Sequence, residues 1–282
     1  MLFRFDPYAG PRRAGERAVR TDRDFHGSDD GVTRIPNFAV IIPAAGQGTR
    51  FSAGCPAASF CGKKPYVPLA GKAVWLWSAE KFARRSDVIQ IILVVSPQDA
   101  GEVRSHFRSD LERLGVEVVS GAAERCLSVE NGLAAVSPQA DYVAIHDAAR
   151  PCITDGTIDA VFRAAVECRA AIPAVPIVGT VKRSLSEEGV PPVIEETVPR
   201  GGLWEAQTPQ VFDTQLYREA VACRDARSLP TDDAGLLEAM GIKPRLVEGD
   251  RTNIKITTLL DLSLAELLLK LLENGPNPNR VV

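Results

Sequence analysis

A short glycine-containing segment follows the first apolar run of the chain and has residue types suited to binding phosphate. The run Phe38–Ile42 leads directly into Pro-Ala-Ala-Gly-Gln-Gly-Thr-Arg, which ends at Arg50. Small residues let backbone N–H groups approach a ligand closely, and such a loop at a strand end suits phosphate oxygens. A dinucleotide fingerprint would need a third glycine where Phe51 stands, and no Gly-Lys-Ser/Thr follows for a P-loop. A tight strand-to-helix turn without a ligand would have the same composition.

Basic residues follow this loop. Arg50 ends it, and Lys63 and Lys64 come a little further along the chain. A bound triphosphate needs such cations, because charge shifts among its oxygens during phosphoryl chemistry. Taken singly, each of these residues would be an ordinary solvated surface charge, so only their combination with the loop indicates a phosphate site.

A carboxylate ends a later apolar run. Tyr142–Ile145 is followed by His146 and Asp147, and Arg150 comes three residues further on. Because Asp147 stands where a strand delivers side chains to the edge of a sheet, we predict that it binds a metal ion. Mg²⁺ favours one or two carboxylates together with substrate phosphates. The alternative is a helix-capping aspartate paired with Arg150. On an alternating strand His146 should point away from Asp147, and we expect it to be structural.

The elements that must position these residues alternate between short apolar strands and helices. Several strands are apolar on both faces, which is typical of a parallel sheet covered by helices on each side. The alternation predicts a doubly wound α/β domain whose strand ends meet at one ligand crevice. We expect strands at 38–42, 89–95, 116–119, 142–145, 171–175 and 243–247, and helices at about 72–85, 97–114, 123–137, 155–170, 213–225, 231–240 and 259–272.

Three segments depart from this pattern. Residues 1–36 are rich in Arg, Asp, Gly and Pro, which predicts a disordered extension before a folded domain at 37–274. Residues 275–282 read as a flexible tail. Residues 176–202 contain two extended segments around a turn. A two-stranded excursion of this kind cannot bury itself, so we expect a β-arm that reaches a partner subunit in a homodimer.

Composition excludes several classes of protein. The chain has 282 residues, of which 45% are hydrophobic, and a net charge of −3, without the basic surplus typical of nucleic-acid binding. No apolar run approaches the roughly 20 residues needed to cross a bilayer, so we expect no membrane association. The six cysteines form no Cys-x-x-Cys pair. We expect free, mostly structural thiols and a cytoplasmic location.

Seven motifs in order carry a family resemblance. They are AVIIPAAGQGTR, GAAERCLSVENGL, HDAARP, GTVKR, TVPRGGLWEAQTPQ, TDDA and NIKIT. Over about residues 37–272 the chain closely resembles the 2-C-methyl-D-erythritol 4-phosphate cytidylyltransferases of the non-mevalonate isoprenoid pathway. The resemblance implies a Rossmann-like nucleotidyltransferase fold and a dimer interlocked by its arms. It also implies CTP and Mg²⁺ as co-substrate and cofactor, with 4-diphosphocytidyl-2-C-methyl-D-erythritol and pyrophosphate as products.

The resemblance also implies a role for individual residues. The nucleotide would be lined by Ala44, Ala45, Gly46 and Gly48, and its base would meet Gly121, Ala122 and Ser128. Asp147 would bind Mg²⁺. The transition state would be stabilised by Arg50 and Lys64, and the sugar-alcohol phosphate would be seated by Arg150, Thr180, Arg200 and Lys255. Of these, Arg200 and Lys255 would orient the attacking phosphate and count with the catalytic residues.

The chain departs from the family pattern at a few positions. Lys64, two residues before Tyr66, fits the usual spacing of the catalytic lysine, but Lys63 is the alternative. Ala122 stands where a glycine is usual, which requires a negative φ there. Any second metal carboxylate near Lys255 would have to be Asp250.

Other functions would use the same fold. A ribitol 5-phosphate cytidylyltransferase has a similar loop and strand-end aspartate, and a nucleotide-binding module could lack activity altogether. The attacking phosphate monoester is already charged at neutral pH, so the reaction needs no general base. The sequence fits this requirement, because it shows no Ser–His–Asp or Cys–His set.

Overall fold

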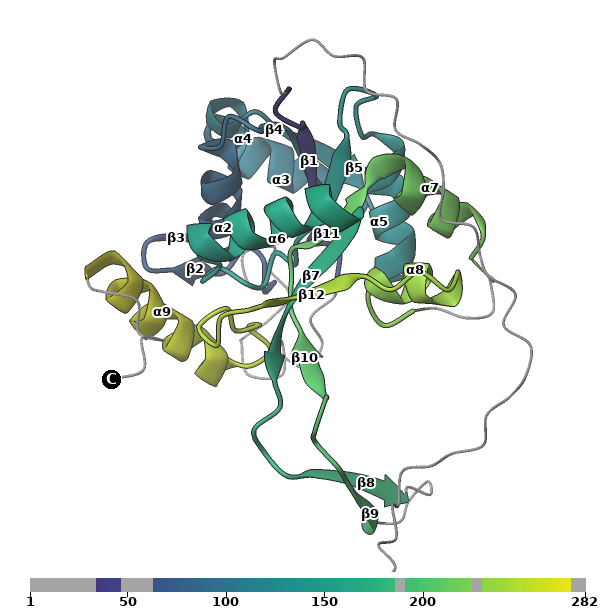
Figure 1. Cartoon of the computed structure of the whole chain (residues 1–282). Coiled ribbons are helices and arrows are strands. Elements are labelled where there is room, and N and C mark those ends of the chain that lie inside the picture. The colour runs from purple at the N-terminus through teal and green to yellow at the C-terminus, as the bar shows by residue number, and fades with distance from the viewer. Residues whose placement is uncertain (1–33, 47–62, 186–190, 225–229, 275–282) are drawn as a thin grey trace, which may run out of the picture. The chain divides into compact units, whose positions relative to one another are not determined.

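An eight-stranded sheet runs through the part of the chain that this computed structural model describes, which is residues 34–46, 63–185, 191–224 and 230–274 (Figure 1). The strand order is β10-β7-β11-β6-β1-β4-β5, and β12 pairs with β7. The strands are β1 (Phe38–Pro43), β4 (Val88–Val95), β5 (Val116–Ser120), β6 (Tyr142–Ile145), β7 (Ala170–Pro176), β10 (Trp204–Ala206), β11 (Gln210–Asp213) and β12 (Arg245–Glu248).

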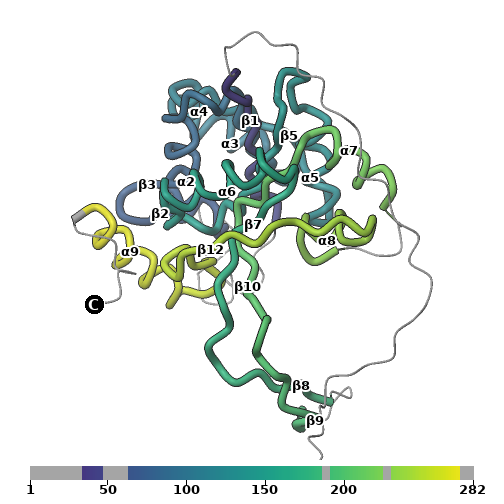
Figure 2. The backbone as a smooth tube through the Cα atoms, in the orientation of Figure 1, coloured from purple at the N-terminus to yellow at the C-terminus, as the bar shows by residue number. Residues whose placement is uncertain are grey.

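Helices cover both faces of this sheet, as the tube in Figure 2 also shows. One face packs against α2 (Val74–Ala83), α3 (Ala100–His106), α4 (Arg108–Leu114) and α6 (Asp155–Cys168). The other packs against α5 (Arg125–Ala134), α7 (Thr214–Ala222) and α8 (Ala234–Ala239). Because successive side chains of a strand point to opposite faces, the apolar run of β1 supplies both cores. Val40 and Ile42 belong to one, and Ala39 and Ile41 to the other.

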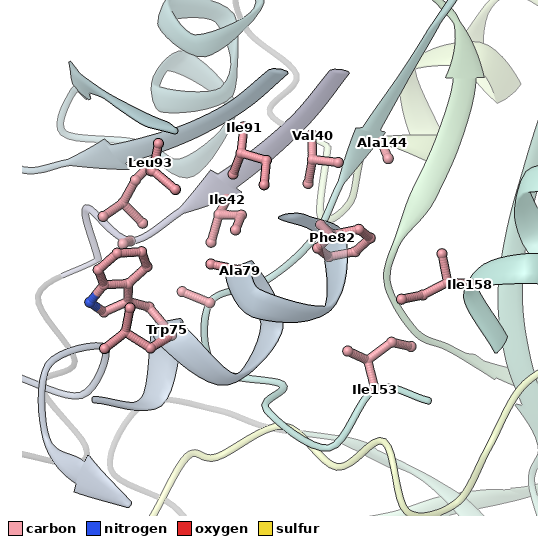
Figure 3. Packing of buried hydrophobic residues seen from close by; sticks show 14 of the residues in the cluster. Val40, Ile42, Trp75, Ala79, Phe82, Ile91, Leu93, Ala144, Ile153 and Ile158 are labelled. Carbon is pink, nitrogen blue, oxygen red and sulfur yellow. The ribbon is translucent and has the colours of Figure 1, made fainter. Parts of the chain in front are cut away.

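The first of these cores contains the largest aromatic cluster. Figure 3 shows Val40 and Ile42 of β1 packed toward Trp75 and Phe82 of α2. The Trp75 ring meets Phe107 edge-on, with 5.5 Å between ring centroids. Phe107 lies between α3 and α4, so the single helix expected at 97–114 is divided there. The Phe107 ring is buried at this boundary.

The doubly wound, mostly parallel sheet is confirmed. β1 pairs in parallel with β4 and β6, and β4 pairs in parallel with β5, so these four strands end at one edge. The sequence did not predict β10 and β11, which run antiparallel beside β7. β11 also pairs antiparallel with β6 and so separates β6 from β7. Both strands are too short, at three and four residues, to give a recognisable apolar pattern.

Two small sheets and a last helix complete the described chain. The arm forms a hairpin of β8 (Val181–Leu185) and β9 (Val193–Val198) that extends from β7 and β10 (Figure 1). The hairpin of β2 (Pro68–Leu69) and β3 (Lys72–Ala73) packs near α9 (Leu259–Asn274) in a third apolar cluster. The NIKIT segment has no regular structure. No helix in the described ranges is long and apolar enough to span a membrane.

Candidate active site

The loops after β1 and β5 touch each other at the carboxyl edge of the sheet. Ala44 donates its backbone N–H to Val94 O at 2.7 Å, and Gly121 donates to Val95 O at 2.7 Å. Both loops are therefore fixed to the end of β4. A Cβ on Gly121 would lie 2.9 Å from the Cβ of Ala45. It would also lie 2.7 Å from Ser128 Oγ, so the side chains of Ala45 and Ser128 leave no room for a larger residue at position 121.

Ser128 of α5 holds the turn that follows Gly121. Its hydroxyl accepts a hydrogen bond from Ala122 N at 3.0 Å and lies 3.0 Å from Glu124 O. The side chain is buried, at 1% exposure, so it supports the turn from inside. Ala122 is not among the described non-glycine residues with positive φ, so the condition that its methyl group imposes is met. Gly46 is exposed after β1.

Asp147 lies at the end of β6 among three cations. Lys255 Nζ is 2.6 Å from its Oδ2, and Arg125 Nη2 is 3.2 Å from its Oδ1. Arg150 Nε lies 3.9 Å from Oδ2. Asp147 is 8% exposed, whereas the side chain of Lys255 is 42% exposed. The cluster therefore presents a buried carboxylate beneath a lysine that solvent and ligands can reach.

The charges around Asp147 decide its protonation. Burial alone would raise the pKa of Asp147, but the charges of Arg125 and Lys255 and the Lys255 hydrogen bond hold it well below its usual range. Burial also lowers the pKa of the neighbouring His146, to about 4, and for an imidazole this favours the uncharged form. At neutral pH the site therefore contains an ionised carboxylate beside an uncharged imidazole.

His146 is structural, as the alternation predicted. Its Nε2 lies 3.1 Å from the Ser78 hydroxyl and 3.1 Å from Arg150 O. Its Nδ1 lies 3.2 Å from the hydroxyl of Thr208. That hydroxyl also accepts the backbone N–H of Asp147 at 3.1 Å. The imidazole therefore fixes the segment that carries Asp147 rather than facing a ligand.

Distant motifs are joined by hydrogen bonds behind Asp147. Asn253 of NIKIT donates through Nδ2 to Thr208 O at 2.9 Å, and Gln207 donates to Asp250 O at 2.8 Å. The carboxylate of Asp250 accepts from Thr252 N at 2.7 Å and from its hydroxyl at 2.6 Å. The carboxylate of Asp250 therefore shapes the turn before Lys255, and its role as a second metal carboxylate stays a prediction.

The guanidinium of Arg150 makes its contacts inside the protein. It is 6% exposed, and its Nη1 donates to Asn253 O at 2.7 Å. Its Nε is buried without a hydrogen bond. The pairing with Asp147 that belonged to the helix-capping alternative exists, but Lys255 and Arg125 lie closer to that carboxylate. Arg150 therefore ties the β6 loop to the segment before Lys255.

The structure describes four further predicted residues, Lys63, Lys64, Thr180 and Arg200. Lys63 forms an ion pair with the buried Asp99 at 2.5 Å, and Lys64 is half-buried. Thr180 and Arg200 are exposed at the base of the arm, where Arg200 donates to Val178 O. Neither has a hydrogen bond or ion pair with the Asp147 cluster in the described part of this chain. Gly48 and Arg50 fall outside the described residues.

Two charged residues of the site were not predicted from the sequence. Arg125 and Asp233 meet at 2.8 Å, and the same Arg125 nitrogen contacts Asp147. Both residues belong to motifs that carried the family resemblance, GAAERC and TDDA. Their opposite charges were the available signal, but nothing in the sequence gave the pairing across 108 positions.

The donor set fits a magnesium ion that arrives with its substrate. The described residues contain no group of three His, Cys, Asp or Glu side chains that could hold a metal by themselves. Asp147 is a single ionised carboxylate whose two oxygens already face positive charge. Mg²⁺ is commonly bound by one or two carboxylates and by phosphate oxygens of the substrate, which matches this arrangement.

The doubly wound sheet, the paired loops after β1 and β5 and the carboxylate after β6 define a nucleotide-binding α/β protein of the nucleotidyltransferase type. The family model for 2-C-methyl-D-erythritol 4-phosphate cytidylyltransferase matches residues 38–271. The chain belongs to this family.

Named relatives agree over nearly their whole lengths. The 2-C-methyl-D-erythritol 4-phosphate cytidylyltransferase of Dechloromonas aromatica is 40% identical over 244 residues, covering 84% of this chain and 99% of the relative. The enzyme of the same name from Tolumonas auensis is 39% identical over 241 residues, covering 84% and 98%. The crystal structure of the Thermus thermophilus enzyme is 32% identical, with a TM-score of 0.66 over 83% of this chain and 100% of that one.

Proposed function

We propose that this chain transfers the cytidylyl group of CTP to 2-C-methyl-D-erythritol 4-phosphate. A phosphate oxygen of the sugar alcohol attacks the α-phosphorus, the bond from that phosphorus to the bridging oxygen breaks, and pyrophosphate leaves. The observation that carries the proposal is Asp147, ionised between Lys255 and Arg125 at the strand edge where the β1 and β5 loops meet. Family membership and the names of the relatives support the substrates.

The residues at hand supply charge and position rather than proton transfer. The attacking phosphate has a second pKa near 6 and is already anionic at neutral pH. His146 is fully buried and both ring nitrogens have partners, so it is not placed to take a proton from a substrate. Exposed Lys255 offers a cation to the incoming phosphate. Catalysis then depends on positioning and on stabilising charge as it develops.

Magnesium, a homodimer and a cytoplasmic location are parts of this proposal. Asp147 would hold Mg²⁺ together with the triphosphate, and the ion would neutralise charge on the phosphate oxygens. The arm carries exposed apolar side chains at Val178, Leu185, Val193 and Ile194, which supports burial against a second subunit. Thr180 and Arg200 would then act in the partner's site. The described cysteines Cys126, Cys152, Cys168 and Cys223 are free thiols, which supports a reducing compartment.

A pyrophosphate-release assay tests the function. Purified protein is given Mg²⁺, one nucleotide and one sugar-alcohol phosphate, and we expect release with CTP and 2-C-methyl-D-erythritol 4-phosphate. ATP, GTP and UTP should react far more slowly, because the turn that Ser128 holds would fit the cytosine base. Faster formation of CDP-ribitol from ribitol 5-phosphate would replace the proposed substrate. No pyrophosphate from any pair would indicate a binding module without activity.

A further inference from the structure

Arg125 is shared between two carboxylates that come from different parts of the fold. Its Nη2 lies 3.2 Å from Asp147 Oδ1, after β6, and 2.8 Å from Asp233 Oδ2, just before α8. The Nε of Arg125 also reaches Asp147 Oδ1, at 3.4 Å. The shorter contact is the one to Asp233. Arg125 therefore has a partner that remains if its contact with Asp147 is given up.

Asp233 is built as a fixed anchor. Its side chain is 3% exposed, and its other oxygen, Oδ1, accepts a hydrogen bond from the Tyr217 hydroxyl at 2.9 Å. Tyr217 is itself 1% exposed in the core between α7 and the sheet. A buried carboxylate needs such partners, because an unpaired buried charge is costly. Each oxygen of Asp233 thus has a partner, a neutral hydroxyl on one side and Arg125 on the other.

Asp147, in contrast, has a cation on both of its oxygens. Lys255 contacts Oδ2 at 2.6 Å and Arg125 contacts Oδ1. A divalent cation that binds Asp147 must weaken at least one of these contacts. Lys255, whose side chain is 42% exposed, can turn toward solvent or phosphate, whereas Arg125 is also held by Asp233.

We infer that Asp233, fixed by Tyr217, is a positioning residue that retains Arg125 when Asp147 takes a divalent cation with the nucleotide. The inference rests on the proposed function and names how this chain prepares its carboxylate for metal. Without the charge of Asp233, Arg125 has Asp147 as its remaining carboxylate and competes with the metal for it. With Asp233 in place, Arg125 stays beside the site and can face the phosphates with its remaining N–H groups.

The test measures metal binding directly. Mn²⁺ binding to the purified protein is followed by electron paramagnetic resonance, with and without CTP. Asp233→Asn keeps the shape of the side chain and an oxygen for Tyr217, and should weaken Mn²⁺ binding about 10-fold, as expected when a residue that supports a metal ligand is changed. Tyr217→Phe should weaken it in the same direction, and it serves as the second variant if Asp233→Asn does not fold.

A double mutant distinguishes positioning from general damage. In an Arg125→Gln background, Asp233→Asn should change Mn²⁺ affinity less than about twofold, because Asp233 acts through Arg125. An equal loss in both backgrounds would overturn the inference. Glu130→Gln is the matched control, since Glu130 lies on the same helix and pairs with Arg224 at 2.7 Å. A similar loss in this control would also overturn it.

The result of the Mn²⁺ binding series can be distinguished from the result of the pyrophosphate-release assay. Mn²⁺ binding is read without turnover, so the series can be scored even if wild-type protein releases no pyrophosphate. Circular dichroism confirms that each variant is folded before its affinity is compared. Unchanged Mn²⁺ affinity in folded Asp233→Asn and Tyr217→Phe would show that Arg125 needs no anchor.

Discussion

Lys63 and Lys64 are neighbours in the chain, and the structure gives Lys63 a defined structural role. Its Nζ pairs with buried Asp99, and its carbonyl accepts the backbone N–H of Tyr66 at 2.8 Å. This arrangement fixes the segment that carries Lys64, and it favours Lys64 as the residue that meets phosphate. The assignment of Lys64 from its spacing to Tyr66 stays a prediction until each lysine is replaced separately.

Replacing the two lysines separately tests this assignment. Lys64→Met should lower kcat about 100-fold, as expected for the loss of one pre-organised cation. Lys63→Met should leave kcat within a few-fold of wild type but lower the free energy of unfolding by about 1 kcal/mol, because Asp99 loses a partly exposed partner. Steady-state kinetics and urea unfolding measure the two effects. The reverse pattern would assign catalysis to Lys63.

Cys152 and Cys223 should differ in their reactivity toward an alkylating agent at alkaline pH. Burial raises the pKa of the Cys152 thiol to about 12, whereas Cys223 is exposed. In the unfolded chain Cys152 ionises near its ordinary value of about 8.5. Between these values the unfolded state has lost a proton that the folded state retains, so stability falls as pH rises through the interval.

Iodoacetamide at pH 9 followed by peptide mass spectrometry should show Cys223 modified and Cys152 protected. Equal labelling would contradict the buried environment.

The resemblance predicted site roles for Asp147, Lys255 and Gly121, and the structure adds how these residues are held. The alternating pattern placed Asp147 at the end of a strand, whereas Lys255 lies in a segment without regular structure. Arg125 and Asp233 were missed because pairing between distant charges depends on packing that no local pattern records. For Ser128 the resemblance suggested a contact with the base, and the structure shows a buried hydroxyl that holds the turn.

Among the elements, the parallel strands were predictable because each is a continuous apolar run. β1 and β4 are buried on both faces, and this demands helices on each side. β10 and β11 were not predictable, since two short strands are defined by what they pair with. The boundary between α3 and α4 at the buried Phe107 was likewise not predictable, since the sequence has a helical pattern on both sides of it.

The packing of α5 against the sheet can be tested at one glycine. A Cβ on Gly132 would lie 2.8 Å from Ile41 Cγ2 and 2.9 Å from Val94 Cγ2. Gly132→Ala should therefore lower the free energy of unfolding by about 1–3 kcal/mol through overpacking, although alanine favours a helix. Urea unfolding followed by circular dichroism gives the value.

Gly156 of α6 is the matched control for this change. It is also helical, but a Cβ there would meet nothing within 4 Å. Gly156→Ala should raise the free energy of unfolding by about 0.5–1 kcal/mol. If both variants changed stability equally, the close contact between α5 and the centre of the sheet would not be limiting.

On the scale of the molecule, the arm predicts how copies of the chain associate. Ile194 is 66% exposed on β9, and Ile194→Asp should convert a dimer into a monomer by placing charge in the contact. Leu267→Asp on α9 is the control, because Leu267 is 59% exposed on a different element. Sedimentation velocity distinguishes the two species. A wild-type monomer, or an Ile194→Asp dimer, would refute association through the arm.

Mixed subunits test whether the arm completes a neighbour's site. Arg200→Ala and Asp147→Asn should each be inactive alone, because each removes one part of every site. Co-expressed, they form some mixed dimers in which one site has both intact parts, so activity should return. Persistent inactivity in verified mixed dimers would mean that Arg200 serves the subunit that carries it.

The hairpin of β8 and β9 forms a separate two-stranded sheet within the described chain, and its side chains stay largely uncovered. If those side chains are buried against a second copy of the chain, the activity per molecule depends on the protein concentration. Diluting the protein below the dissociation constant of the arm contact would then silence it without unfolding it. A cell making few copies would have little activity, and a modest rise in expression would produce a more than proportional rise in product.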